Sequence, residues 1–189
     1  HTTCAIVGPS GSGKTTLCNL IARFWDVQDG AVRIGGKDVK NYTADSILEH
    51  ISIVFQNVYL FHDSIENNIK FGKPDATHEE VEAAAKRACC HDFISALPDG
   101  YNTIIGEGGS TLSGGEKQRT AIARMLAASP DLIMFDEPFS ALDSHLKSNL
   151  EGEILAASDA LGGQALFVSH DRDEVYRLTD RIAVMDRGY

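Results

Sequence analysis

The feature that most limits what this chain can fold into is the octapeptide Gly-Pro-Ser-Gly-Ser-Gly-Lys-Thr at positions 8–15. It fits the pattern G-x-x-x-x-G-K-S/T and follows an apolar segment, residues 2–7, that is typical of a short buried strand. After it, apolar residues recur at the spacing of one helical face, which we expect to pack on a sheet: Leu17, Leu20, Ile21 and Phe24. The sequence therefore predicts a strand, a phosphate-binding loop and a helix.

The glycines of such a loop let the backbone curl until its N–H groups and the helix N-terminus face an anion. Lys14 is expected to neutralise the β and γ phosphates of a nucleotide, and the Thr15 hydroxyl to ligate Mg²⁺. The predicted nucleotide-binding residues of this segment are Gly8, Pro9, Ser10, Gly11, Ser12, Gly13, Lys14, Thr15 and Thr16.

Further apolar runs, each four or five residues long, suit a parallel sheet that is covered on both faces: residues 51–55, 132–135, 165–168 and 182–185. The pattern changes between residues 57 and 129, where we expect one helix near residues 79–96 and another at residues 116–128. The sequence thus predicts an α/β core with an inserted, mainly helical lobe.

An acidic pair, Asp136 and Glu137, ends the apolar run at residues 132–135. In isolation such a pair more often marks the start of a helix. Nucleotide sites form at the carboxyl edge of a parallel sheet, however, and the phosphate-binding loop favours that interpretation. We therefore predict Asp136 as a Mg²⁺ ligand, direct or through water, and Glu137 as the base that orients water towards the γ-phosphate.

Residues 112–119, Leu-Ser-Gly-Gly-Glu-Lys-Gln-Arg, read as a second helix start at which backbone N–H groups lie open. Ser113 can cap the helix, and the glycine pair Gly114 and Gly115 suits a second phosphate-binding end. This segment resembles the signature motif of ATP-binding cassette (ABC) ATPases. In that family the motif completes the active site of the opposing subunit, which implies a nucleotide-binding role for Ser113, Gly114 and Gly115.

The resemblance covers essentially the whole chain, because the other family motifs follow in order. Gln56 matches the Q-loop glutamine, which approaches Mg²⁺ and the attacking water, so the resemblance implies a catalytic and a metal-binding role. Residues 140–143 match the D-loop, which crosses the dimer interface and brings Asp143 to the nucleotide. His170 matches the switch histidine at the γ-phosphate. Taken singly, Gln56 and His170 would read as polar ends of strands.

The resemblance implies one ABC ATPase domain with a P-loop NTPase (RecA-like) core at residues 1–56 and 130–189. Residues 57–129 would form the helical and signature lobe. It also implies Mg²⁺-dependent ATP hydrolysis in a head-to-tail dimer of nucleotide-binding domains, bound to the transmembrane domains of a transporter at the cytoplasmic face of a membrane. The transported substrate cannot be read from such a chain, because the family selects it in transmembrane segments.

Composition bears on the partners. The net charge of −10 disfavours a general nucleic-acid binder, and no apolar run approaches the roughly 18–20 residues that cross a bilayer, so the chain itself is expected to be soluble. Two alternatives stay open: a non-transport ABC ATPase, and a truncated domain that binds ATP without efficient turnover.

Two departures from the family pattern stand out. Family members carry an N-terminal β-segment with an adenine-stacking aromatic and continue beyond the last strand, and we expect both parts to be missing here. Residues 1–137 look exporter-like, notably at residues 59–72 and 106–109. Residues 138–189 look importer-like, as in Ser-His-Asp-Arg-Asp-Glu-Val at 169–175, so a natural mosaic or a constructed chimera stays open.

Overall fold

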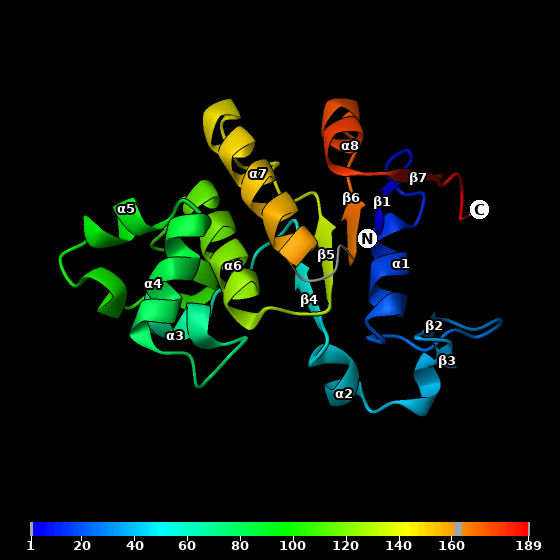
Figure 1. The fold of residues 1–189 in the computed structure, drawn as a ribbon, viewed down its shortest axis with the longest axis horizontal. Coiled ribbons are helices and arrows are strands. Elements are labelled where there is room, and N and C mark those ends of the chain that lie inside the picture. The colour runs from blue at the N-terminus through cyan, green and yellow to red at the C-terminus, as the bar shows by residue number, and fades with distance from the viewer. Residues whose placement is uncertain (1, 161–163, 189) are drawn as a thin grey trace.

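A five-stranded parallel sheet forms the centre of the computed structural model, which describes residues 2–160 and 164–188 (Figure 1). The strands lie in the order β4-β5-β6-β1-β7, so the chain crosses over repeatedly between parallel neighbours. Their bounds are β1 (Thr2–Val7), β4 (Ile51–Val54), β5 (Leu132–Asp136), β6 (Gln164–Val168) and β7 (Arg181–Val184). The predicted parallel sheet is confirmed, with each predicted strand found within one residue at either end.

Both faces of the sheet are apolar because successive side chains of a strand point to opposite sides. In β5, Ile133 and Phe135 join one hydrophobic cluster, whereas Met134 joins the other. The rings of Phe135 and Phe167 stack with their centroids 4.9 Å apart. This double burial explains why the strands read as continuous apolar runs rather than as alternating ones.

Helices cover each face of the sheet. Cys18 of α1 (Lys14–Ile21) and Ile47 of α2 (Ala44–Leu48) belong to the cluster that contains Met134. The other face carries α6 (Gly114–Ala128), α7 (Ser144–Ala160) and α8 (Arg172–Leu178), whose apolar residues join the larger cluster. In Figure 1, α2 lies below the lower end of β4 and α8 lies above the upper end of β6.

The segment between β4 and β5 is mainly helical and lies to one side of the sheet (Figure 1). Its helices are α3 (Ile65–Lys70), α4 (His78–Arg87) and α5 (His91–Ser95), with single 3-10 turns η2 (Gly100–Asn102) and η3 (Glu107–Gly109). Two of these helices, α3 and α4, pack on α6, α5 packs on α4, and all three share the larger hydrophobic cluster with the sheet.

The prediction of one helix at residues 79–96 is wrong, because the chain forms α4 and α5 with a break between them. Cys89 adopts a left-handed conformation with φ of 53°. The N–H of Cys90 then reaches back to the carbonyl of Ala85 at 2.9 Å, and the N–H of Cys89 to that of Lys86 at 3.0 Å. These are the two bonds of a Schellman stop. No glycine marked it in the sequence.

The predicted apolar face of the first helix is also partly wrong. Helix α1 ends at Ile21, and Phe24 lies beyond it, 46% exposed and beside Phe55. The residue of α1 most deeply buried against the sheet is Cys18, at 1% exposure, with Leu17 and Ile21 beside it. Arg23 has a left-handed φ of 57°, which turns the chain out of the helix, so Phe24 does not extend the apolar face of α1.

A small hairpin, β2 (Arg33–Ile34) and β3 (Lys37–Asp38), precedes the 3-10 turn η1 (Val39–Asn41) and was not predicted. Gly35 and Gly36 form its two-residue turn with φ of 58° and 81°. A glycine pair between two strands is a known signal for such a turn. Among the described helices, none combines the length and the apolar character that crossing a membrane requires.

The stacked Phe135 offers a test of this core. We expect Phe135→Ala to lower the free energy of unfolding by about 3–5 kcal/mol, because it empties a fully buried site directly before the acidic pair. Tyr176→Ala, at a 76% exposed aromatic, should stay within about 0.5 kcal/mol. Urea unfolding followed by circular dichroism measures both. Equal losses in the two variants would contradict this account of the core.

Candidate functional site

The carboxyl edge of the sheet carries an open cavity of about 550 Å³. Its walls come from the loop after β1, the start of α1 and the residues that follow β4, β5 and β6. The lining residues are Gly8, Ser10, Gly11, Gly13, Lys14, Thr15, Thr16, Gln56, Asp136, Glu137 and His170. Residues from four distant parts of the sequence therefore meet here, and all of them were predicted site residues.

The loop between β1 and α1 can only be built with glycine at several positions. Gly11 and Gly13 have φ of 78° and 100°, which side-chain-bearing residues rarely adopt. Gly8 has an ordinary φ, but a side chain there would collide with the main-chain oxygen of Met185. The loop thus presents its backbone to the cavity, as an anion site requires.

Lys14 lies within this loop, and its side chain is buried rather than free in solvent. Its ammonium donates to the carbonyls of Gly8 at 2.8 Å and Pro9 at 2.9 Å. These two bonds hold the cation beside the open N–H groups of the loop. A phosphate oxygen in the cavity would meet a pre-positioned positive charge.

Thr15 and Asp136 meet on the floor of the cavity, where the Thr15 hydroxyl donates to Asp136 Oδ2 at 2.7 Å. Asp136 is the last residue of β5 and is 5% exposed. A hydroxyl and a carboxylate oxygen side by side suit a hard cation such as Mg²⁺, which uses one or two protein carboxylates and takes its other ligands from phosphates and water. The predicted metal ligands Thr15, Gln56 and Asp136 all line this cavity.

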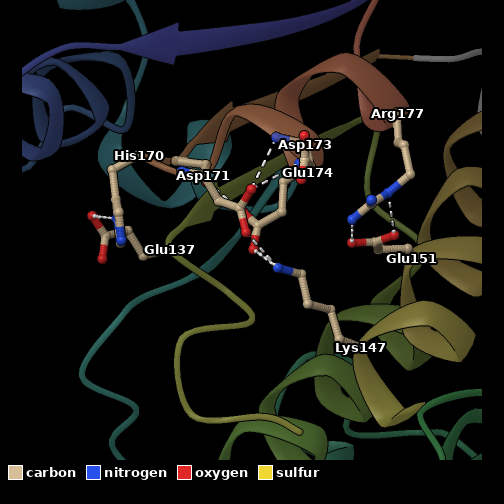
Figure 2. A network of polar contacts seen from close by, with 9 residues as sticks. Glu137, Lys147, Glu151, His170, Asp171, Asp173, Glu174 and Arg177 are labelled. Atoms are coloured by element: carbon tan, nitrogen blue, oxygen red, sulfur yellow. Dashed lines mark hydrogen bonds and ion pairs between the residues drawn. The ribbon is translucent and has the colours of Figure 1, made fainter. Parts of the chain in front are cut away.

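Glu137 is held in a strained conformation between two polar partners. Its φ of 50° is unusual for a residue with a side chain, and its N–H donates to the carbonyl of Val168 at 2.9 Å. Gln56 Nε2 donates to Glu137 Oε2 at 2.9 Å. His170 Nδ1 lies 3.0 Å from Glu137 Oε1, a contact that Figure 2 shows. An ionised carboxylate only accepts hydrogen bonds, so this contact is a hydrogen bond in the His170 tautomer that carries the proton on Nδ1.

Six predicted site residues do not line the cavity. Pro9 and Ser12 belong to the phosphate-binding loop but are not among the residues that line the cavity. Asp143 instead caps α7, accepting from the N–H of Leu146 at 3.0 Å. Ser113 caps α6, which begins with Gly114 and Gly115, and none of the three lines the cavity. Within one chain, therefore, the structure does not bring the start of α6 or the turn before α7 to the phosphate-binding loop.

Ser113 is engaged in a capping box at the start of α6. Its hydroxyl lies 2.7 Å from Glu116 Oε2, and its main-chain N–H donates to the same oxygen at 2.8 Å. The glycine pair lies against the turn before α7, so that a side chain on Gly115 would approach the carbonyl of Ala141 to 3.2 Å. Ser113 and Gly114 are exposed at the surface.

One contributor to the site escaped sequence reasoning. Residues 185–188 follow β7 and brace the phosphate-binding loop: the N–H of Met185 donates to Val7, and that of Gly188 to Ser12 at 3.1 Å. The Met185 side chain also lies against Gly13. These contacts are mostly made by main-chain atoms, which carry no residue-specific signal in a sequence.

Comparisons with known proteins agree with this geometry. Residues 1–140 match the family model described as ABC transporter. The chain is 44% identical over 98% of its length to the mitochondrial iron-sulfur clusters transporter ATM1 of Gibberella zeae, and 43% identical over 97% to the ATP-dependent lipid A-core flippase of Desulfotalea psychrophila. A solved structure of a bacterial Atm1-family ABC exporter with ATP bound superposes with a TM-score of 0.91 at 41% identity over 99% of the chain.

The chain spans only part of each of these proteins: 26% of the Gibberella transporter, 32% of the flippase and 32% of the chain in the solved exporter. The match to the family model nevertheless covers most of the present sequence, and the fold and the cavity agree with it. The chain therefore belongs to the ABC transporter family, as a nucleotide-binding domain homologous to those of ABC exporters.

Proposed function

We propose that this domain binds ATP with Mg²⁺ in the cavity at the sheet edge and hydrolyses it to drive an ABC exporter. The observation that carries the proposal is the cluster of Gln56, Glu137 and His170 beside the phosphate-binding loop. A structural anion site would need the loop and Lys14 alone. Hydrolysis also needs a group that orients water and accepts its proton, and the Glu137 carboxylate, held by Gln56 and His170, supplies it.

The triphosphate would lie along the loop, with its oxygens accepting from the open N–H groups and from Lys14. Lys14 would then exchange its bonds to the Gly8 and Pro9 carbonyls for bonds to phosphate. Thr15 and Asp136 would hold Mg²⁺ through the hydroxyl and a carboxylate oxygen. When bound, the ion would neutralise charge that develops on the phosphate oxygens.

Hydrolysis needs a water molecule placed in line with the bond between the γ-phosphorus and the oxygen that bridges to the β-phosphate. Glu137 would orient this water and accept its proton as the oxygen attacks the γ-phosphorus, and the bridging bond breaks to leave ADP and phosphate. Gln56 and His170 each hold one oxygen of the Glu137 carboxylate. These contacts hold the Glu137 carboxylate in one orientation before the reaction, so it need not reorient when water attacks.

We further propose that two copies, or this domain and a homologous one, pair head to tail so that Ser113, Gly114 and Gly115 of one face the ATP held by the other. In support, Ser113 and Gly114 at the start of α6 are exposed and do not line the cavity of their own chain. Asp143 lies in the turn that packs on the same glycines, so it would also lie at that interface. One triphosphate could then use two helix N-termini from two chains.

The exporter assignment and the membrane partner rest on the relatives. Several are named for export, such as the β-(1→2)glucan export protein NdvA of Brucella melitensis and a multidrug efflux protein of Mycobacterium bovis. We propose that transmembrane domains anchor this domain at the cytoplasmic face of a membrane. The names describe chemically unrelated cargoes at similar identity, so this domain does not identify what is transported.

The role of Glu137 can be tested with Glu137→Gln. The amide keeps the shape and the contact with Gln56 or His170 but cannot accept the proton, so kcat should fall by about 10²- to 10⁴-fold while ATP affinity stays near that of the parent. Phosphate release and equilibrium binding of ATP measure the two quantities. Asp29→Asn, at an exposed loop carboxylate, is the control and should leave both unchanged. Parent-like turnover by Glu137→Gln would remove Glu137 from the mechanism.

The composite site can be tested by complementation. Ser113→Arg places a bulky cation where the hydroxyl would donate to the partner's γ-phosphate, and we expect a loss of about 10²- to 10³-fold in rate. Lys14→Ala should weaken nucleotide binding in its own chain. An equimolar mixture would form heterodimers in which one site joins an intact Lys14 to an intact Ser113. Phosphate release should therefore recover partly on mixing.

Two results would contradict this dimer. Ser113→Arg could hydrolyse ATP at full rate as a monomer, or mixing the variants could give no more activity than the sum of the two alone while heterodimers form. Ser110→Arg, three residues upstream of the helix cap, is the matched control for an added charge on this surface and should keep most activity.

A further inference from the structure

Lys147 places a single cation between two carboxylates of a neighbouring helix (Figure 2). Its ammonium lies 2.7 Å from Asp171 Oδ2 and 2.7 Å from Glu174 Oε1. Lys147 belongs to the first turn of α7, whereas both acids belong to the start of α8. The Glu174 side chain is only 8% exposed, so its charge needs this partner.

These two acids hold the turn that contains His170. Asp171, the residue after His170, caps α8 by accepting from the N–H groups of Asp173 and Glu174. Ser169, the residue before His170, is buried; its hydroxyl contacts Glu174 Oε2 and accepts from the N–H of Asp171 at 3.0 Å. Both neighbours of His170 are thus tied to carboxylates that Lys147 holds.

His170 itself has little packing to fix it. Its side chain is 71% exposed, and the polar contact that the structure gives its ring is the one with Glu137. The direction of the ring therefore depends on the backbone of the turn at residues 169–171. A pocket of about 230 Å³ lies between this turn and residues 137–142, and Lys147 lines it together with Glu137 and His170. The ammonium of Lys147 also lowers the pKa of Asp171, which keeps the cap charged.

We propose that Lys147 is a positioning residue for hydrolysis: through Asp171 and Glu174 it holds the turn that aims His170 at Glu137. This inference rests on the proposed function of Glu137 and His170. Lys147 touches neither the phosphate-binding loop nor the reacting atoms, so it acts only through the two acids. Without Lys147, the negative charges of Asp171 and Glu174 would repel each other. We therefore expect the turn at residues 169–171 to move away from Glu137.

The structure contains a matched control for this idea. Arg177 of α8 pairs with Glu151 of α7 through two bonds of 3.0 and 2.9 Å, so it joins the same two helices. Glu151, like Glu174, has a side chain that is 8% exposed. Arg177 lies at the opposite end of α8 from the His170 turn, as Figure 2 shows. Removing either cation leaves a buried carboxylate unpaired, but only Lys147 supports the turn.

The experiment compares Lys147→Met with Arg177→Met in the full chain. Both should lose similar thermal stability. Lys147→Met should lower kcat by about 10- to 100-fold with little change in KM for ATP, because a small displacement of a catalytic group costs rate rather than binding. Arg177→Met should retain most of kcat. Lys147→Arg, which keeps a cation that can reach two carboxylates, should restore most of the rate.

A second measurement needs no turnover. In NMR spectra of the nucleotide-free protein, the His170 amide and imidazole signals should shift or broaden in Lys147→Met and stay in place in Arg177→Met. If Lys147→Met does not fold, Asp171→Asn serves instead, since asparagine still caps α8 but loses the charge that Lys147 binds. It should disturb the same signals.

Equal loss of kcat in Lys147→Met and Arg177→Met would show a general stabilising role and overturn the proposal, as would undisturbed His170 signals in Lys147→Met. Failure of the proposed function gives a different result, namely turnover that does not depend on Glu137. In that case the NMR comparison still decides whether Lys147 holds the His170 turn.

Discussion

The main-chain hydrogen bonds between parallel strands are the interaction on which the rest of this structure depends. The register pairs Asp136 of β5 with Val168 of β6, and Val168 in turn with Ile6 of β1. Each strand therefore ends at the same edge, and the residues that follow these positions include Gly8, Glu137 and His170. A shift of one residue in any strand would turn its apolar side chains to the wrong cluster, so the packing of both faces fixes the register. The cavity is a consequence of that register.

The same edge stores backbone strain at the residue proposed to act on water. A left-handed φ at a residue with a side chain costs of order 1–3 kcal/mol and persists only where the surroundings enforce it. At Glu137 the enforcement is visible: the N–H is bound to Val168, the two carboxylate oxygens to Gln56 and His170. The ends of three strands, β4, β5 and β6, thus meet at one residue. In our proposal, the ion pairs of Lys147 with Asp171 and Glu174 extend this support to the turn that contains His170.

Two independent physical reasons favour glycine at both positions 114 and 115, at the start of α6. One is the open N–H groups that suit an anion. The other is close packing: a side chain on Gly115 would press on the carbonyl of Ala141, and one on Gly114 would contact the Ala141 side chain. The helix start and the turn at residues 140–143 therefore form one surface. This packing explains how both motifs could serve a single interface although residues 116–139 lie between them in the chain.

The sequence by itself determined the local units: the phosphate-binding loop, the buried strands and the order of motifs that identified the family, because spacing and residue type decide these features. It could not place the break at Cys89, since a left-handed stop usually needs glycine and here depends on packing. Nor did it reveal the exposed position of Phe24, the bracing by Met185 or the tie from Lys147 to Asp171 and Glu174. Those contacts join residues that are far apart along the chain, or use backbone atoms that every residue has. Only the tertiary structure decides them, because they exist only once strand register and helix packing have brought the partners together.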